Sequence, residues 1–271
     1  GVTPACTKLA AAFYGLAIEH VHPVSSTSSA EMVKLLENTF RSVNIGLVNE
    51  LCQMSQKLGV DVWEIIDAAA TKPFGFMPFY PGPGLGGHCI PIDPHYLAWK
   101  ARINGFNPRF IDLAGVVNAE MPEYVVRKAQ DVLNKRSKAL KGSRILIFGV
   151  TYKKNISDVR ESPALEIIEL LEKQGAEVSY TDPFVPELTL HGKTYRGRLV
   201  DTAKGRMGDA AQDRIAESPR HRVSVSEQYD LAVIVTDHAA FDKDAILASA
   251  PVVLDTRNVF RGVKNEKIVR I

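Results

Sequence analysis

The sequence predicts an all-α region over residues 25–140, followed by an α/β domain with a parallel sheet over residues 141–271. The first part rests on apolar residues that recur at helical spacing from Met32 to Met54, over about seven turns. The second part rests on short apolar runs at 144–150, 177–182, 231–236 and 252–255, with a helical pattern at 163–174. Strands that are apolar on both faces and alternate with helices are typical of a parallel sheet.

The long helix is expected to start at a capping box formed by Ser28 and Glu31 and to end near residues 58–59. Ahead of it, residues 7–18 predict a helix and residues 20–24 a short extended piece. A domain rarely begins on a helix with no strand before it. We therefore interpret residues 1–24 as the tail of a domain that is otherwise absent.

The rest of the helical region consists of three predicted segments. Asp61 is expected to cap a helix over 62–70, and Asp93 to cap a helix over 94–103 that has Pro94 as its first residue. A further helical pattern covers 111–135, with Pro122 marking a kink or a new start. No strand is predicted between residues 25 and 140, and residues 191–223 are interpreted as a loop-rich insertion.

Composition excludes several classes of protein. Of the 271 residues, 45% are apolar and 24% are charged, and the formal charge is +2, which gives no reason to expect nucleic acid as a partner. No apolar run approaches the roughly 20 residues that span a bilayer, so we expect no membrane association. Three cysteines without metal-ligand spacing predict free thiols in a reduced, cytoplasmic setting.

A glycine-rich loop separates the second and third of these helices. Gly82, Gly84 and Gly87 match the pattern G-x-G-x-x-G, which in a dinucleotide site joins a strand to a helix N-terminus. Here prolines interrupt the segment, no strand precedes it, and the third glycine leads to Cys89 instead of a helix. We therefore reject a dinucleotide turn and expect a loop whose main chain approaches a ligand closely.

Cys89 is the candidate nucleophile of this loop. It lies shortly before a predicted helix N-terminus, which favours the thiolate. The alternative is a buried structural cysteine in a tight turn. A metal site formed with His88 and His95 lacks a second close cluster of ligands, and we predict no metal. Asp93 can cap the helix with one carboxylate oxygen and face a ligand with the other.

Lys34 and Asn38 lie four residues apart, on one face of the long helix, with Arg41 a turn further on. A solvated polar stripe is the ordinary explanation of such a triplet. Their position in a mostly apolar helix also allows a buried polar site.

Three motifs resemble the UDP-glucose/GDP-mannose dehydrogenase family, and most closely the branch that oxidises UDP-N-acetylhexosamines. They are AEMVKLLENTFRSVNIGLVNEL (residues 30–51), FYPGPGLGGHCIPIDP (79–94) and GVTYKKNISDVRESPALEI (149–167). The resemblance implies a helical dimerisation domain over 25–140 and a Rossmann-like UDP-sugar-binding domain over 141–271. Residues 1–24 are similar only to the end of the family's NAD-binding domain, so the NAD site is expected to be mostly missing and the chain to be a fragment.

The resemblance also implies a mechanism in which a sugar alcohol is oxidised twice, to the carboxylate, with NAD. Cys89 is then the nucleophile that forms a thiohemiacetal and later a thioester. Lys34 stabilises the oxyanion, Asn38 holds an oxygen or a water, and Asp93 positions or activates the hydrolytic water.

The resemblance further implies substrate contacts in three segments. The glycine loop supplies Gly86 and Gly87, with Phe79 and Tyr80 packing on uracil or sugar or simply filling the core. Lysines in place of glycines after the first strand suggest a sheet that binds a nucleotide sugar through charge. The remaining candidates for substrate contact are Lys153, Arg160, Arg257 and Lys72. Arg160 alternatively pairs with Asp158 or Glu161, and Lys72 is expected to reach across a dimer.

We therefore expect part of an NAD-dependent UDP-N-acetylhexosamine 6-dehydrogenase, homodimeric through the helix at about 28–58. By itself the chain is expected to bind UDP-sugar without turnover. The alternatives within the family are a UDP-glucose 6-dehydrogenase and a GDP-mannose dehydrogenase. Outside it they are a non-catalytic nucleotide-sugar-binding module and a cysteine hydrolase or acyltransferase, for which no His/Asp pair is placed by sequence to serve Cys89.

Overall fold

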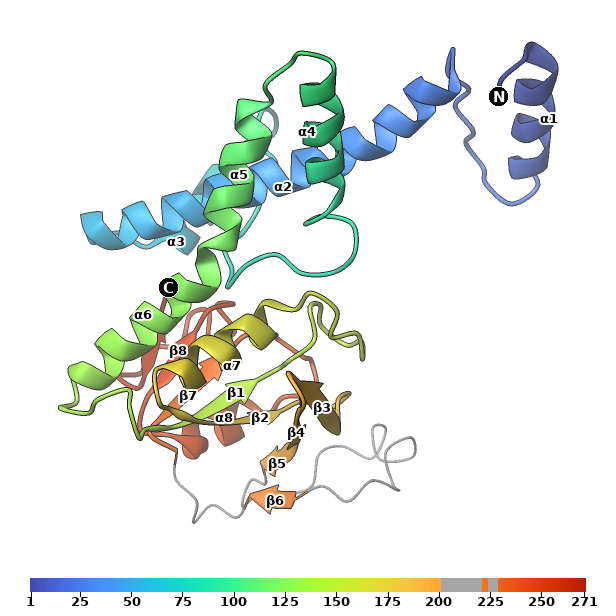
Figure 1. Cartoon of the computed structure of the whole chain (residues 1–271). Helices are drawn as coiled ribbons and strands as arrows, with labels where there is room; N and C mark the ends of the chain where they lie inside the picture. The colour runs from blue at the N-terminus through green and yellow to red at the C-terminus, as the bar shows by residue number, and fades with distance from the viewer. Residues whose placement is uncertain (201–220, 224–228) are drawn as a thin grey trace.

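The computed structural model describes residues 1–200, 221–223 and 229–271. A helical region precedes a parallel sheet with helices on both faces, as the sequence predicts (Figure 1). Residues 25–140, all of them described, contain no strand. Within the described ranges no helix is both long and apolar enough to cross a membrane.

The long helix, α2 (Thr27–Leu58), forms the backbone of the helical region. It begins two residues earlier than predicted, because the Ser26 hydroxyl accepts the Ser29 amide and Ser26, not Ser28, is the N-cap. The Ser28–Glu31 box is therefore wrong. Among consecutive serines and threonines, all of which can cap a helix, the sequence does not distinguish the one that does.

Four shorter helices complete the region: α3 (Val62–Ala69), α4 (Asp93–Ile103), α5 (Arg109–Ala119) and α6 (Met121–Asn134). The Asp61 carboxylate caps α3 through the amides of Trp63 and Glu64, as predicted. Pro122 lies in the first turn of α6, which confirms a new start at this point. Helix α5 packs along α2, and α6 continues towards the sheet (Figure 1).

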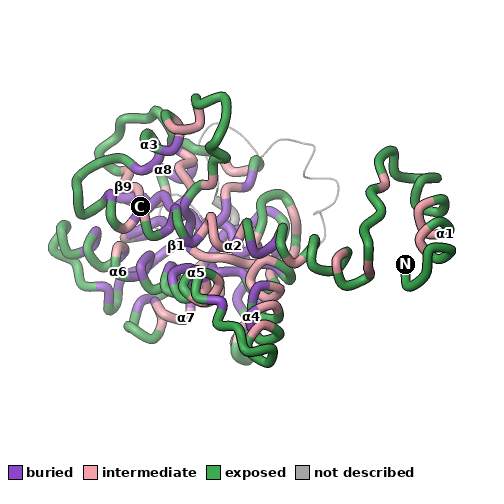
Figure 2. Tube along the Cα trace, turned by 90° about the horizontal axis from the view of Figure 1, so that it is seen from above, coloured by how far each residue is buried: buried purple, intermediate pink, exposed green. Residues whose placement is uncertain are grey.

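The first helix, α1 (Pro4–Tyr14), starts and ends earlier than predicted. Thr3 accepts the Cys6 amide and Pro4 fits the first turn, so the cap lies ahead of the predicted start. None of its residues is buried, and both views show it apart from the rest of the chain (Figures 1 and 2). Residues 20–24 form no strand.

The main sheet has five parallel strands in the order β2-β1-β7-β8-β9. They are β1 (Arg144–Phe148), β2 (Glu177–Thr181), β7 (Leu231–Ile234), β8 (Val253–Asp255) and β9 (Ile268–Arg270). The first four are predicted and β9 is not. A connection of a dozen residues without a helix joins β9 to β8, so the sequence offers no alternation there to reveal it.

Both faces of the sheet are covered. Side chains alternate along β1, so that Ile145 and Ile147 belong to one core cluster and Leu146 and Phe148 to the other. Helices α6 and α7 (Pro163–Lys173) cover the first face, and α8 (Lys243–Ser249) covers the second. This arrangement explains why the strands are apolar on both sides.

The predicted insertion is more ordered than expected where it is described. It is flanked by β3 (Glu187–Leu190), which pairs antiparallel with β4 (Lys193–Arg196), and it contains β5 (Arg198–Val200), which pairs with β6 (His221–Val223). The β3–β4 turn uses His191 and Gly192, both with positive φ. The rest of the predicted insertion, residues 201–220, lies outside the described residues.

Candidate functional site

The glycine loop joins α3 to α4 and places Cys89 at the surface. Residues 81–83 of the loop are buried, whereas Cys89 is exposed and its thiol is free. The Cys89 carbonyl accepts the amides of Ile92 and Asp93, at 3.1 and 2.8 Å. These bonds fold residues 89–93 into a single turn that leads directly into α4. No strand precedes the glycines, which agrees with rejecting a dinucleotide turn.

Asp93 does not cap α4. It is the first helical residue, Ile92 is the N-cap, and no side chain caps this helix. The Asp93 carboxylate accepts the side-chain amide of Asn38 at 2.5 Å, and the Asn38 carbonyl oxygen in turn accepts from Arg41 at 2.9 Å. The capping prediction is wrong because a tertiary partner on α2 takes the carboxylate. Asn38 is 2% exposed, so the polar site that the sequence left open on α2 is buried there.

Lys34 lies one turn before Asn38 and is exposed. Helical periodicity puts the two on the face of α2 that meets Asp93. The structure therefore brings Asn38 and Asp93 into contact and leaves the lysine free to approach a ligand beside them.

The glycines allow the loop to lie directly on the segment that follows β1. A Cβ built on Gly86 would be 2.6 Å from the Tyr152 Cβ and 2.7 Å from the Glu161 carbonyl oxygen. Gly87 has a φ of +87° and donates its amide to the Arg160 carbonyl oxygen at 3.3 Å. Because only glycine permits this approach, the loop that carries Cys89 is fixed against the sheet domain.

A buried asparagine network holds the start of the loop. Asn49, on α2, accepts the Gly82 amide at 3.0 Å and donates to the Asn118 carbonyl oxygen at 2.9 Å, and Asn118 donates to the main chain of Ser42. Sequence reasoning missed both asparagines. Their only signal is that polar side chains occur on the apolar faces of two helices.

Arg257 joins this loop to the sheet. Its Nε donates to the Val235 carbonyl oxygen at 2.8 Å, and a Cβ on Gly82 would lie 2.6 Å from its Nη1. Burial lowers the pKa of this guanidinium, partly offset by Asp237. Arg257 thus presents a half-buried positive charge at the carboxyl edge of the sheet, next to the glycine loop.

The segment after β1 carries the predicted lysine. Lys153 is exposed, and the Thr151 hydroxyl donates to its carbonyl oxygen at 2.9 Å. The chain after β1 leaves the sheet through Gly149, where a Cβ would lie 2.5 Å from Thr236. Strands β1 and β7 are neighbours, but the chain continues from β1 to β2 on one side and from β7 to β8 on the other. In open parallel sheets, ligands bind beyond the carboxyl ends of two such strands. Lys153 lies at this position.

The same edge does not fit NAD. A dinucleotide site needs a glycine turn at a helix N-terminus and an acidic side chain at the end of the second strand that is free for the ribose. Here the turn carries Tyr152, Lys153 and Lys154, and the carboxylate after β2, Asp182, is fully buried in bonds to protein donors.

Arg160 pairs with Asp158, which was the alternative to a substrate contact. Three hydrogen bonds of 2.7–3.1 Å join its guanidinium to the Asp158 carboxylate and lower the pKa of that carboxyl to about 2. Glu161 is exposed and forms no part of this pair.

The two loop aromatics contact the protein. Phe79 packs edge-on against Phe40 and borders the main core, and Tyr80 stacks on Trp63 and donates its hydroxyl to Asp67 at 2.8 Å. Phe79 thus has the core-filling role that the sequence left open, whereas Tyr80 is 43% exposed and does not fill the core.

Two further predictions concern exposed side chains. Lys72, at the start of the loop, is exposed. His88 and His95 are exposed as well, and among the described residues no three His, Cys, Asp or Glu side chains gather to hold a metal ion.

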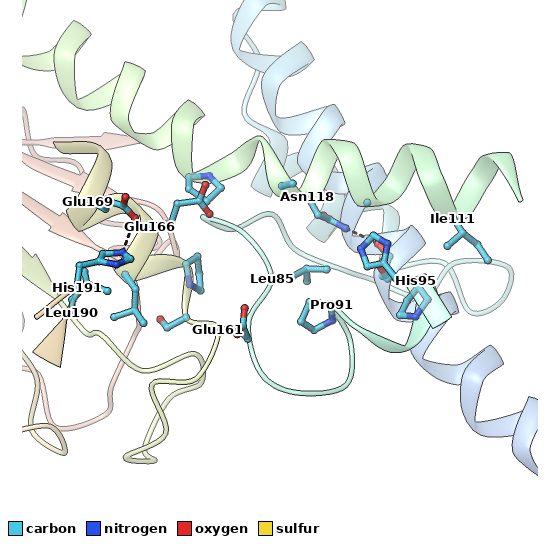
Figure 3. Close-up of a pocket in the computed structure, with 18 residues that line it drawn as sticks. Leu85, Pro91, His95, Ile111, Asn118, Glu161, Glu166, Glu169, Leu190 and His191 are labelled. Atoms are coloured by element: carbon cyan, nitrogen blue, oxygen red, sulfur yellow. Dashed lines mark hydrogen bonds and ion pairs between the residues drawn. The ribbon is translucent and has the colours of Figure 1, made fainter. Parts of the chain in front are cut away.

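A cleft of about 540 Å³ borders the glycine loop at Leu85 and Pro91. In Figure 3 one wall of the cleft is formed by His95, Ile111 and Asn118 of the helical region, and the other carries Glu161, Glu166 and Glu169. Leu85 and Pro91 of the glycine loop lie between the two walls. Three carboxylates, those of Glu161, Glu166 and Glu169, make it unsuited to a diphosphate. None of the predicted catalytic side chains lines it.

Comparison with known proteins yields two family matches. Residues 28–120 match the model of the UDP-glucose/GDP-mannose dehydrogenase family, central domain, and residues 146–262 match that of the same family's UDP binding domain.

Relatives of known name agree with these matches. The chain is 39% identical over 183 residues to UDP-N-acetyl-D-mannosamine dehydrogenase of Methanococcus maripaludis, covering 68% of this chain and 41% of the relative. It is 38% identical over 186 residues to UDP-N-acetyl-D-glucosamine 6-dehydrogenase of Pseudomonas aeruginosa, covering 68% and 44%. The chain thus spans less than half the length of these two relatives.

Among solved structures, a UDP-D-ManNAc dehydrogenase of Pyrococcus horikoshii superposes on the whole chain with a TM-score of 0.80, at 28% identity, and 58% of that protein is covered.

Proposed function

Because the chain belongs to the UDP-glucose/GDP-mannose dehydrogenase family, we propose that it is part of an NAD-dependent UDP-N-acetylhexosamine 6-dehydrogenase. In this proposal residues 25–140 carry the catalytic loop, residues 141–271 bind the UDP-sugar, and residues 1–24 belong to an NAD-binding domain. The observation that carries the proposal is the packing of the Cys89 loop onto the segment that bears Lys153. The named relatives act on UDP-N-acetylmannosamine and UDP-N-acetylglucosamine.

The diphosphate is proposed to lie over the carboxyl edge of the sheet. Lys153 follows β1 and Arg257 follows β8, so both supply positive charge on the same edge of the sheet, which suits an anionic ligand. The uridine and sugar are then directed along the stretch between Lys153 and Cys89, where Gly86 and Gly87 allow the loop to lie directly on Tyr152 and the Arg160 main chain. Arg160 is less suited to this role, because its guanidinium is already paired with the Asp158 carboxylate.

Cys89 is proposed as the covalent catalyst. Its thiolate attacks the C6 carbonyl carbon of the intermediate aldehyde, a C–S bond forms, and the carbonyl oxygen takes up a proton to give a thiohemiacetal. The thiohemiacetal would then lose a hydride from C6 and a proton from its oxygen to give the thioester. Water adds to the thioester carbonyl and the C–S bond breaks, which releases the carboxylate, a proton and the thiol. The two hydrides released in the oxidations would go to NAD, a cofactor that the carboxyl edge of the sheet described above does not fit.

The polar groups on α2 suit two needs of this reaction, which are to orient the attacking water and to stabilise the oxyanion at C6. Asn38 fixes one oxygen of Asp93, which leaves the other oxygen of this half-buried carboxylate to orient the attacking water. Lys34, one turn away on the same face, is proposed to stabilise the oxyanion that develops at C6.

Apolar side chains on α2 support a homodimer through this helix. Leu36, Leu47 and Met54 are 62%, 52% and 48% exposed, and similar side chains continue on α5. Exposed apolar side chains that recur along one face of a helix are typical of a protein interface. Lys72 is proposed to reach the partner's site. Light scattering of the wild type and of Leu47→Asp tests the interface, with a dimer and a monomer as the expected results.

Calorimetric titration tests the substrate assignment. UDP and UDP-N-acetylglucosamine should release heat with the 271-residue chain, and GDP should bind more weakly. Absence of heat with both uridine ligands at millimolar concentration would contradict the proposal, and tighter binding of GDP would favour a GDP-mannose enzyme. In the whole protein supplied with NAD, Cys89→Ser should block acid formation while the substrate still binds.

A further inference from the structure

A buried polar cluster lies beneath the segment that carries Lys153. It is formed by Thr151 after β1, Asp182 after β2 and His238 after β7. The side chains of Asp182 and His238 are fully inaccessible to solvent. The rings of Phe184 and Phe241 lie 5.1 and 5.3 Å from the His238 ring and cover it. The mechanism proposed above uses none of these groups.

The Asp182 carboxylate ties two loops together. One oxygen accepts the Val150 amide at 2.8 Å and the His238 Nε2–H at 2.9 Å, and the other accepts the Phe184 amide at 2.8 Å. A buried carboxylate is costly unless donors surround it, and here three do.

His238 extends the same network to the far side of Lys153. Its Nδ1 accepts the Asn155 amide at 2.9 Å, so this nitrogen carries a lone pair and the ring proton sits on Nε2, facing Asp182. Asn155 has a positive φ of 61°, and its side-chain oxygen accepts the Ala239 amide at 3.0 Å. The ring thus connects the carboxylate to a turn that few residues adopt.

The segment after β1 is therefore held on both sides of the exposed lysine, at Val150 by Asp182 and at Asn155 by His238. The hydroxyl of Thr151, itself 3.1 Å from His238 Nε2, adds a bond to the carbonyl oxygen of Lys153. A loop that is fixed before the ligand arrives loses less conformational entropy on binding.

We propose that His238, braced by Asp182, is a positioning residue that holds the segment after β1 so that Lys153 points at the diphosphate of the nucleotide sugar. This inference rests on the proposed function, because it assumes that Lys153 contacts the ligand. It goes beyond that function by assigning affinity to a side chain that the ligand cannot touch.

Two substitutions of similar size test separately the hydrogen bond of the His238 ring to Asn155 and its hydrogen bond to Asp182. In His238→Asn the side-chain oxygen occupies the place of Nδ1 and keeps an acceptor for Asn155, whereas in His238→Gln the amide occupies the place of Nε2 and keeps the donor to Asp182. UDP affinity is measured by calorimetry on the 271-residue chain. Lys153→Ala tests the lysine itself, and Lys154→Ala is the control for charge in the same segment.

We expect His238→Gln to bind UDP about three- to tenfold more weakly than the wild type, the worth of one hydrogen bond. His238→Asn loses the donor that braces Asp182 but keeps the acceptor for Asn155, so it should lose less affinity than His238→Gln. Lys153→Ala should fall at least as far as His238→Gln. The positioning role would be overturned, and the proposed function left intact, by either of two results. One is an equal loss of UDP affinity in both His238 variants, and the other is unchanged affinity of His238→Gln together with weaker binding by Lys153→Ala. An unchanged Lys153→Ala would instead refute the lysine contact.

Amide hydrogen exchange tests, without any ligand, whether the His238 ring holds the Asn155 amide. The Asn155 amide should be protected in the wild type and in His238→Asn, and exposed in His238→Gln. Exchange of this amide at the rate of a free peptide in the wild type would overturn the inference even if neither variant folds.

Discussion

Gly86 is the position where a single added methyl group tests the packing of the catalytic loop. Its φ lies outside the left-handed region, so alanine introduces no backbone strain of that kind. The new Cβ would meet the Tyr152 Cβ at 2.6 Å and the Glu161 carbonyl oxygen at 2.7 Å. Ordinary contacts between carbon atoms are about 3.5–4.0 Å, so the loop must move away from the sheet domain by roughly 1 Å.

Overpacking of this kind destabilises a protein by about 1–3 kcal/mol. Gly115→Ala is the matched control, because its Cβ would approach only the exposed His95 ring, at 3.3 Å. Alanine in this helical position is expected to be neutral or stabilising by up to about 1 kcal/mol.

The assay is urea unfolding of both variants, followed by UDP titration of the folded proteins. Gly86→Ala should have the lower free energy of unfolding and should bind UDP more weakly, because the shift separates the Cys89 loop from Lys153. If Gly86→Ala were as stable as Gly115→Ala, the loop would not lie on Tyr152 and Glu161, and the site described above would be refuted.

Other expected results concern the cysteines, a helix cap and an ion pair. Burial raises the pKa of Cys52 to about 12, so at pH 8 only about one Cys52 thiol in ten thousand is ionised. Iodoacetamide should therefore label Cys52 far more slowly than the exposed Cys89, and equal labelling rates by mass spectrometry would contradict the burial of Cys52. Asp61→Ala should lower stability by about 0.5–2 kcal/mol, since it removes the α3 cap, and an unchanged urea midpoint would argue against the cap. Arg160 lowers the pKa of Asp158 from 3.8 to about 2, so the pair stabilises the fold above pH 3.8 and this contribution is lost as the pH falls towards 2. In Arg160→Gln the Asp158 carboxyl should titrate at a higher pH by NMR, and an unchanged midpoint would show that the pair does not form.

Much of the fold follows from local patterns in the sequence. Sustained helical spacing predicts α2, and apolar runs predict β1, β2, β7 and β8 with nearly the observed bounds. These elements are predictable because their burial is uniform along their length. Strand β9 and the β3–β4 hairpin have only half-buried or alternating residues, and their pairing partners decide their structure.

The site is less predictable because it depends on contacts between distant residues. Asp93 has every local feature of an N-cap, yet Asn38, 55 residues earlier, takes its carboxylate. Likewise, Asp182 directly follows β2, His238 comes after Thr236 and Asp237 beyond β7, and nothing local indicates that Asp182 and His238 meet. A polar side chain directly after a strand is a signal that points to Asp182 but not to His238.

Differential alkylation of Cys89 tests most directly whether this thiol lies in a nucleotide-sugar site. Cys6, which is exposed on α1, serves as the internal control in the same molecule. Saturating UDP-N-acetylglucosamine should slow the labelling of Cys89 severalfold and leave Cys6 unchanged. If calorimetry shows the ligand bound while both thiols react at their original rates, the sugar does not lie against Cys89 and the account is wrong.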